Sequence, residues 1–374
     1  MKFPIYWLEL FIRQSLKLPC LLSYPLAGKG HAYFALLGHN TIRLRNMIQK
    51  ALVTGGTGFI GSHLVETLLK RGSEVRCLVR NKLDLKWLHG LPVELIEGHC
   101  HNINSLREAV KGVDQVFHSA GVTKAIDEKT YFEVNAIGTK NLIQACIETN
   151  PNLKKFIYLS SQAAAGPCQS NGRKRESDEC LPVSPYGRSK RKGEEFCLEL
   201  SSQIPMIIIR PSAVYGPRDR DVFAFFKILS KGIKPQFSKR EQRISLCYVL
   251  DVIEAILLAS ESKSSEGEIF FISDGQDYRL DRMGDLFTEA LNLHAHQIYV
   301  PGWIISWVAS ASELLSRFTK RPPLINRGKV EEMMQENWLC DITKAKTLLG
   351  YEPQFPLAVG LKITYEWYLK ERWL

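Results

Sequence analysis

Tyr186 and Lys190 lie four residues apart in the segment PYGRSKRKGEEF, which covers residues 185–196. Proline is favoured in the first turn of a helix, so a helix beginning at Pro185 would carry both side chains on one face. Free tyrosine has a pKa near ~10, too high for a base at neutral pH, but a neighbouring cation lowers it. The pair could therefore exchange a proton with a substrate oxygen. Ordinary surface helices also show this spacing, so other parts of the chain must decide.

A glycine-rich segment, ALVTGGTGFIGSHL, contains Gly55, Gly58 and Gly61. Glycines here allow a tight turn and a close approach of the backbone to a pyrophosphate, which then lies at the N-terminus of the next helix. An apolar strand is expected over 50–54 and a helix over 62–71, which is the context that this motif requires. The segment predicts a dinucleotide site rather than a purely structural turn.

The end of the next expected strand, 74–79, indicates which dinucleotide is bound. An acid about 20 residues after the glycines would accept hydrogen bonds from the adenosine ribose. The sequence instead has Arg80, with Lys82 close by. A guanidinium group pairs well with a 2′-phosphate, so NADP(H) is preferred and NAD(H) stays possible. The alternative is that Arg80 is a solvated surface residue.

Strands and helices are expected to alternate from Met47 onward, and this alternation predicts the fold class. It indicates an α/β fold with a Rossmann-type doubly wound parallel sheet and a smaller C-terminal substrate lobe. The expected domains are an extension over 1–46, a dinucleotide-binding core over 47–211, and a mainly substrate-binding lobe over 212–374 with segments returning to the core sheet. Further strands are expected over 115–118, 155–159, 206–210 and 269–272, and further helices over 105–111, 131–149 and 184–200.

Eight motifs in order resemble those of the extended short-chain dehydrogenase/reductase family, within the NAD-dependent epimerase/dehydratase superfamily. They are TGGTGFIG at 54–61, HSAG at 118–121, VNAIGTKNL at 134–142, LSSQAAAG at 159–166, YGRSK at 186–190, RPSAVYGP at 210–217, YVLDV at 248–252 and DITKAKTLLGYEP at 341–353. The chain looks most like the branch with 3β-hydroxysteroid dehydrogenases and dihydroflavonol reductases. This resemblance implies an NAD(P)-dependent oxidoreductase that moves hydride between nicotinamide and a ketone or secondary alcohol.

The resemblance also implies roles for individual residues. Ser161 would hydrogen-bond the substrate oxygen, Tyr186 would transfer its proton, and Lys190 would support the phenolate and hold the nicotinamide ribose. Asn135 matches the family's asparagine on the helix under the active site and completes the implied catalytic set. The implied cofactor-binding residues are Gly55, Thr57, Gly58, Phe59, Ile60, Gly61, Arg80, Ala120, Gly121, Tyr186, Lys190 and Pro211.

Several positions depart from family patterns. Ala165 replaces an aromatic residue near the substrate, and His99 replaces the aspartate expected near adenine. Nucleotide-sugar enzymes on this scaffold usually carry an arginine at the position of Ile244, and here Arg243 is only its neighbour. The pattern favours a fairly hydrophobic substrate. A nucleotide-sugar epimerase or dehydratase, or a non-catalytic NADP(H)-binding regulator, remains an alternative, although Gln162 and Ala163 replace the acidic pair that a dehydratase needs.

The segment VPGWIISWVASASELLSRF, residues 300–318, has apolar side chains at helical spacing. It is expected to pack on the core, to form a wall for an apolar substrate, or to make peripheral membrane contact. The segment is short for a membrane span. The basic runs over 173–175 and 188–192 are interpreted as solvated, together with the neighbouring acids, which include Glu194.

The composition, charge and cysteine content of the chain limit the kinds of function that it can have. The chain has 374 residues, is 45% hydrophobic and 24% charged, as is typical of a soluble globular protein. Half of the net charge of +10 comes from residues 1–46, an acid-poor segment expected to be dispensable or to precede the true start at Met47. No nucleic-acid binding is expected. Nine dispersed cysteines indicate reduced thiols and a cytoplasmic location, and no metal is expected. The expected partner is a small-molecule substrate, and the chain is expected to be a monomer or homodimer.

Overall fold

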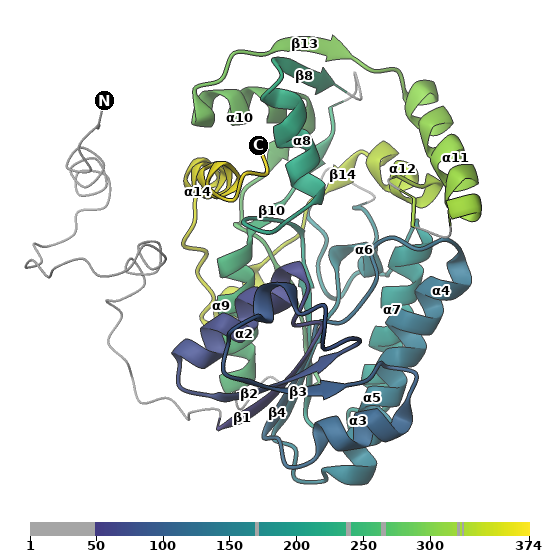
Figure 1. Ribbon diagram of the computed structural model, residues 1–374. Helices are drawn as coiled ribbons and strands as arrows, with labels where there is room; N and C mark the ends of the chain where they lie inside the picture. The colour runs from purple at the N-terminus through teal and green to yellow at the C-terminus, as the bar shows by residue number, and fades with distance from the viewer. Residues whose placement is uncertain (1–48, 169–171, 237–240, 263–266, 320–321, 324) are drawn as a thin grey trace, which may run out of the picture. The chain divides into compact units, whose positions relative to one another are not determined.

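The computed structural model describes residues 49–168, 172–236, 241–262, 267–319, 322–323 and 325–374 (Figure 1). The predictions for residues 1–46 lie outside the described residues. The boundary predicted between 211 and 212 stays a prediction.

A seven-stranded, fully parallel sheet forms the centre of the described chain, in the order β11-β6-β5-β4-β1-β2-β3. Its central strands are short, apolar and buried, as expected for parallel strands covered on both faces. The order changes direction between β1 and β4, where open α/β sheets bind ligands at the carboxyl ends of the strands. The strands are β1 (Lys50–Thr54), β2 (Glu74–Val79), β3 (Val93–Glu97), β4 (Gln115–His118), β5 (Lys155–Leu159), β6 (Met206–Pro211) and β11 (Ile269–Ile272).

Helices cover both faces of this sheet, so the predicted doubly wound α/β class is confirmed (Figure 1). On one face, α2 (Phe59–Lys70) packs against α9 (Val249–Glu261), with α13 (Thr343–Leu349) in the same hydrophobic cluster. On the other face, α5 (Gly138–Thr149) packs between α3 (Ile103–Val110) and α7 (Pro185–Glu199).

Two parts of this core differ from the sequence expectation. The edge strand β3 was not predicted, because its residues are half-buried or exposed and include two acids. Pairing with β2 holds it, and Glu94 forms ion pairs of 2.9 Å with both Arg76 and Lys50. The expected helix 131–149 begins earlier, as α4 (Glu128–Phe132), and contains a π-helical turn (Glu133–Ile137) before α5.

A smaller lobe, named here the C-terminal lobe, is built from the other elements after residue 212 and has an aromatic centre that includes Phe226, Phe287 and Tyr368. Its strands form small sheets, β7 with β10, β8 with β13, and β9 with β12 and β14. Its strands are β7 (Ala213–Tyr215), β8 (Ile233–Gln236), β9 (Arg243–Ile244), β10 (Leu246–Tyr248), β12 (Tyr278–Arg279), β13 (His296–Tyr299) and β14 (Asn337–Trp338). Its helices are α8 (Asp221–Leu229), α10 (Met283–Leu291), α11 (Gly302–Thr319), α12 (Arg327–Met334) and α14 (Leu357–Lys370).

Candidate active site

The glycine segment forms the turn between β1 and α2. Gly55 has a φ of +75°, and a Cβ atom there would lie 2.7 Å from the backbone nitrogen of Ala120 on the loop after β4. Gly58 donates its N–H to the Gly55 carbonyl at 2.9 Å and caps α2 without a side chain. A Cβ on Gly61 would collide with the Gly55 carbonyl. The first turn of α2 is thus approachable and has no capping side chain, which fits a dinucleotide pyrophosphate.

The other residues predicted to bind the cofactor lie at the same edge of the sheet. Arg80 is exposed and directly follows β2, next to β1, with Lys82 also exposed. Ala120 and Gly121 follow β4, and Pro211 ends β6. Thr57, Phe59 and Ile60 occupy the glycine turn and the start of α2 and are half-buried.

Ser161 and Tyr186 meet beyond the carboxyl end of β5. Ser161 caps the short helix α6 (Gln162–Ala165), where its hydroxyl accepts a hydrogen bond from the Ala163 N–H at 3.1 Å. The Ser184 hydroxyl caps α7 by accepting from the Gly187 N–H at 3.0 Å, which places Tyr186 in the first helical turn. The Ser161 hydroxyl is close enough to Tyr186 to lower the pKa of its phenol.

The electrostatics of Tyr186 differ from the sequence expectation. The lysine was predicted to lower the pKa of the phenol. Tyr186 keeps some exposed surface, but burial is the largest influence and raises its pKa well above the usual value. The Ser161 side chain lowers the pKa of Tyr186 but is outweighed by burial, while Glu332 adds to the rise. The phenol is therefore neutral at physiological pH.

Lys190 lies one turn along α7 and is almost fully buried. Its Nζ donates to the Leu159 carbonyl at 2.7 Å and lies 4.1 Å from the ring centroid of Tyr158. Burial lowers the pKa of Lys190 to about 7, although the nearby Glu194 carboxylate partly opposes this. The ammonium group is consequently held at the end of β5, and its charge changes near neutral pH.

Asn135 sits in the π-helical turn and is completely buried. Its Nδ2 donates to the Val122 carbonyl at 3.0 Å and to the Ser189 hydroxyl at 2.9 Å. Its Oδ1 accepts from the Val122 N–H at 2.8 Å. The amide group thereby connects the loop after β4 to the helix that carries Tyr186 and Lys190. A π-turn commonly marks a functional position in a helix.

A buried ionic network lies below these groups. Glu194 accepts hydrogen bonds from the Ser160 hydroxyl at 2.6 Å and from Arg210 at 2.8 and 2.7 Å. Both charged side chains have no exposed surface. The interpretation of Glu194 as a solvated acid was therefore wrong. The Glu194 side chain points from α7 toward β6, and it is buried because the helix packs on the sheet.

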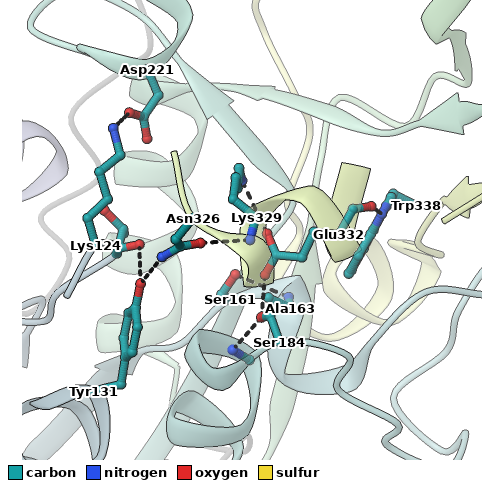
Figure 2. Close-up of polar contacts among 12 residues, drawn as sticks. Lys124, Tyr131, Ser161, Ala163, Ser184, Asp221, Asn326, Lys329, Glu332 and Trp338 are labelled. Carbon is teal, nitrogen blue, oxygen red and sulfur yellow. Dashed lines mark hydrogen bonds and ion pairs between the residues drawn. The ribbon is translucent and has the colours of Figure 1, made fainter. Parts of the chain in front are cut away.

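The C-terminal lobe contributes polar groups that the sequence analysis missed, and Figure 2 shows them around Ser161. Asn326 caps α12 and donates to the hydroxyl of Tyr131 at 2.9 Å, and Tyr131 donates to the Thr123 carbonyl at 3.2 Å. The ring centroids of Tyr131 and Tyr186 are 6.3 Å apart. The sequence could have indicated Tyr131 as a site residue, because it lies one helical turn before Asn135. No sequence pattern indicated Asn326 as a site residue.

Glu332 anchors α12 to the start of α7 (Figure 2). Its carboxylate accepts from the Ser184 hydroxyl at 2.5 Å and pairs with Lys329 Nζ at 3.2 Å. A Cβ on Gly328 would lie 2.8 Å from Pro185 Cδ, so the helices are in direct contact. Tyr186 therefore lies between the sheet edge and α12.

A hollow of about 720 Å³ beside α7 is separate from this site, since neither Ser161 nor Tyr186 lines it. Basic side chains on its wall are paired, Arg188 with Glu128, and Lys192 with Glu195. These contacts fit the predicted solvated role of Arg188 and Lys192. The same interpretation was wrong for Lys190 and for Lys174, which are 3% and 4% exposed; Lys174 donates to the Glu179 carbonyl at 2.7 Å.

Comparison with known proteins adds a family and several relatives. Residues 51–273 match the NAD dependent epimerase/dehydratase family. The chain is 30% identical over 336 residues to a 3-beta-hydroxysteroid dehydrogenase of Mycolicibacterium neoaurum, covering 83% of this chain and 89% of that protein. It is 28% identical over 338 residues to UDP-glucose 4-epimerase of Vibrio cholerae, covering 87% and 97%. The solved UDP-glucuronic acid 4-epimerase from Bacillus cereus, in complex with NAD, is similar with a TM-score of 0.68 at 25% identity, covering 85% of this chain and 96% of that one.

Proposed function

The chain belongs to the NAD dependent epimerase/dehydratase family, and from that premise we propose an NAD(P)-dependent oxidoreductase with Ser161, Tyr186 and Lys190 as its catalytic residues. The observation that carries the proposal is the packing of α6 on α7, which brings the Ser161 hydroxyl close enough to Tyr186 to act on its pKa. Lys190 is held one turn along the same helix, and Asn135 positions that helix. The substrate class is a ketone or secondary alcohol.

The phenol of Tyr186 is protonated before substrate binds, so it can donate a proton. This favours reduction of a ketone as the reaction direction. The nicotinamide, when bound, supplies the hydride to the carbonyl carbon. Ser161 donates a hydrogen bond to the carbonyl oxygen, and the Tyr186 hydroxyl transfers its proton to that oxygen. Protonated Lys190 then stabilises the phenolate that remains. In alcohol oxidation the phenolate would take the proton back.

For the cofactor we propose a preference for NADP(H). Arg80 and Lys82 are exposed beside the predicted adenosine ribose position, where a 2′-phosphate could pair with them. The Bacillus cereus epimerase was solved with NAD, and NAD(H) is the alternative here. Titration with NADPH and NADH would compare the two, and tighter binding of NADH would contradict the preference.

The substrate is proposed to be amphiphilic, with a polar reacting end and an apolar body. Tyr131, Asn326 and Lys329 surround the Tyr186 side of the site with polar groups. The arginine nearest the diphosphate position of nucleotide-sugar enzymes, Arg243, is exposed and bonded to Glu241 at 2.7 Å. Steroid and nucleotide-sugar enzymes are both among the relatives, so a nucleotide sugar is the second candidate.

Cofactor oxidation by the full chain, measured over panels of sterol ketones, long-chain ketones and nucleotide sugars, tests the function. We expect turnover on an apolar ketone. Tyr186→Phe should keep NADPH binding and lose roughly 10²- to 10⁴-fold in turnover, because the proton donor is removed. Tyr365→Phe, in the aromatic cluster of the C-terminal lobe, is the matched control and should be unaffected. Substantial activity in Tyr186→Phe would refute the acid role, and turnover only on nucleotide sugars would favour the second candidate.

A further inference from the structure

Helix α11 carries an apolar face that is open to solvent. Trp303 is 72% exposed, Trp307 is 74% exposed and Phe318 is 79% exposed. Leu314 and Leu315 are also exposed on this helix. Residues 303, 307, 314 and 318 recur at helical spacing, so they form one continuous stripe. This stripe is named here the α11 face.

The rest of the helix is packed, so the α11 face is not a sign of a detached segment. Ile305 and Ala309 are buried and cluster with Val330 of α12. Arg327 at the start of α12 donates its backbone N–H to Glu313 of α11 at 2.7 Å. Within the described residues, the side chains of Trp303 and Trp307 make no hydrogen bond, ion pair or ring contact. Solvent-exposed tryptophans in a large apolar patch usually mark an interaction surface.

Basic residues accompany the α11 face. The sequence over 300–330 holds Arg317, Lys320, Arg321, Arg327 and Lys329 but a single acid, Glu313. Arg327 is 70% exposed in its side chain and pairs with Glu313 at 3.5 Å, and Lys329 pairs with Glu332 at 3.2 Å, so the unbalanced basic residues of this stretch are Arg317, Lys320 and Arg321. An apolar stripe with tryptophan and phenylalanine, in a stretch of sequence that holds more basic than acidic residues, has the chemistry of a helix that lies in the surface of an anionic bilayer. None of the described helices has the length and hydropathy needed to cross a membrane.

We propose that the α11 face docks on an anionic lipid surface, with Trp303, Trp307 and Phe318 entering the headgroup region. A second copy of the chain is a less suitable occupant. In a twofold dimer this stretch of sequence, with three basic residues and one acid over 300–321, would meet its own copy, and like charges oppose association. A bilayer that contains anionic lipid offers the opposite charge.

Docking at this face would bring the candidate active site close to lipid. Helix α12 packs on α11 and reaches Ser184 and Tyr131 through Glu332 and Asn326. An amphiphilic substrate could then pass from the bilayer to Tyr186 along α12. This consequence rests on the proposed function, whereas the docking itself does not.

The test uses the full chain and vesicles of phosphatidylcholine with phosphatidylglycerol. Wild-type protein should co-sediment with them, and tryptophan fluorescence should be quenched when brominated lipid is included. The double variant Trp303→Ser/Trp307→Ser should bind roughly tenfold more weakly and lose the added quenching, because exposed side chains are replaced without disturbing the core. Leu83→Ser is the matched control, since Leu83 is 94% exposed on another part of the molecule.

Equal sedimentation and equal quenching of wild type and double variant would overturn the docking site, even if residues 1–46 bound lipid by themselves. A dimer that the double variant dissolves, with no vesicle binding by wild type, would assign the α11 face to a second copy instead. Catalytic failure on the ketone panel with intact vesicle binding would reject the function and leave the docking site standing.

Discussion

Burial is the main influence on the ionisable groups of the candidate active site. It lowers the pKa of His118 to about 3, so this ring is neutral between the hydroxyls of Thr54 and Thr139. It lowers the pKa of Lys190 and raises that of Tyr186. Both catalytic candidates are therefore shifted toward their neutral forms, and proton transfer at this site starts from an uncharged phenol.

Replacement of Lys190 by methionine should change how stability depends on pH. The folded-state pKa of Lys190 is about 7, below the ~10.4 of an unfolded lysine. Between these values the unfolded chain binds the extra proton, so the wild type should gain stability relative to Lys190→Met as pH rises above 7. Urea unfolding over a pH series measures this. Lys192→Met, which removes an exposed lysine from the same helix, should show little such trend, and a parallel course for Lys190→Met would contradict the shifted pKa.

At the level of elements, helix α7 is fixed to the sheet by the buried pair of Glu194 and Arg210. The pair spans α7 and β6, and the Ser160 hydroxyl at the end of β5 joins it. The proposed catalytic residues Tyr186 and Lys190 lie on the same helix. The network therefore sets the height and rotation of the helix relative to the strand ends.

Arg210→Met should destabilise the protein by about 3–5 kcal/mol, because it leaves the Glu194 charge buried without a partner. The double variant Glu194→Leu/Arg210→Met should recover much of that loss, since it removes both charges. Lys192→Ala breaks a surface pair on the same helix and should cost less than about 1 kcal/mol. Denaturant unfolding of the variants gives the comparison. A small effect of Arg210→Met would mean that water reaches the Glu194 carboxylate.

At the scale of the whole molecule, the site is completed by a helix far along the chain. Residues of α12 contact the start of α7 across more than 140 positions, with Glu332 on Ser184 separated by 148. The glycine turn follows β1 and α7 packs on the sheet, whereas α12 belongs to the C-terminal lobe. In the proposed function, cofactor binding and substrate binding therefore depend on different parts of the fold.

Gly328→Val should separate these two functions. A side chain at this position would press against Pro185, so α12 would be displaced from Tyr186. Such a displacement should lower kcat/KM for the substrate on the order of ten- to hundredfold, while NADPH affinity stays the same. Steady-state kinetics and NADPH titration measure the two effects. Glu331→Ala changes an exposed residue of the same helix and should be neutral; loss of NADPH affinity in Gly328→Val would contradict the division.

The sequence determined the parallel core, the glycine turn and the Tyr186–Lys190 spacing, because each depends on residues close together in the chain. Apolar runs define the strands, glycines define the turn, and a four-residue spacing defines a helix face. The half-exposed edge strand β3 was not predicted, because its hydrophobic pattern is weak and its pairing with β2 is not visible in the sequence.

Only the tertiary structure decided which charges are buried and which distant residues meet. Glu194 is a charged residue among other charged residues of a helix, a pattern typical of a solvated position. Packing of this helix on β6 makes Glu194 part of a buried ion pair. Asn326 and Glu332 gave no local signal, since their role arises from contact between two lobes. The pKa of Tyr186 rises rather than falls for the same reason: desolvation depends on everything packed around a group, and the sequence shows only its neighbours along the chain.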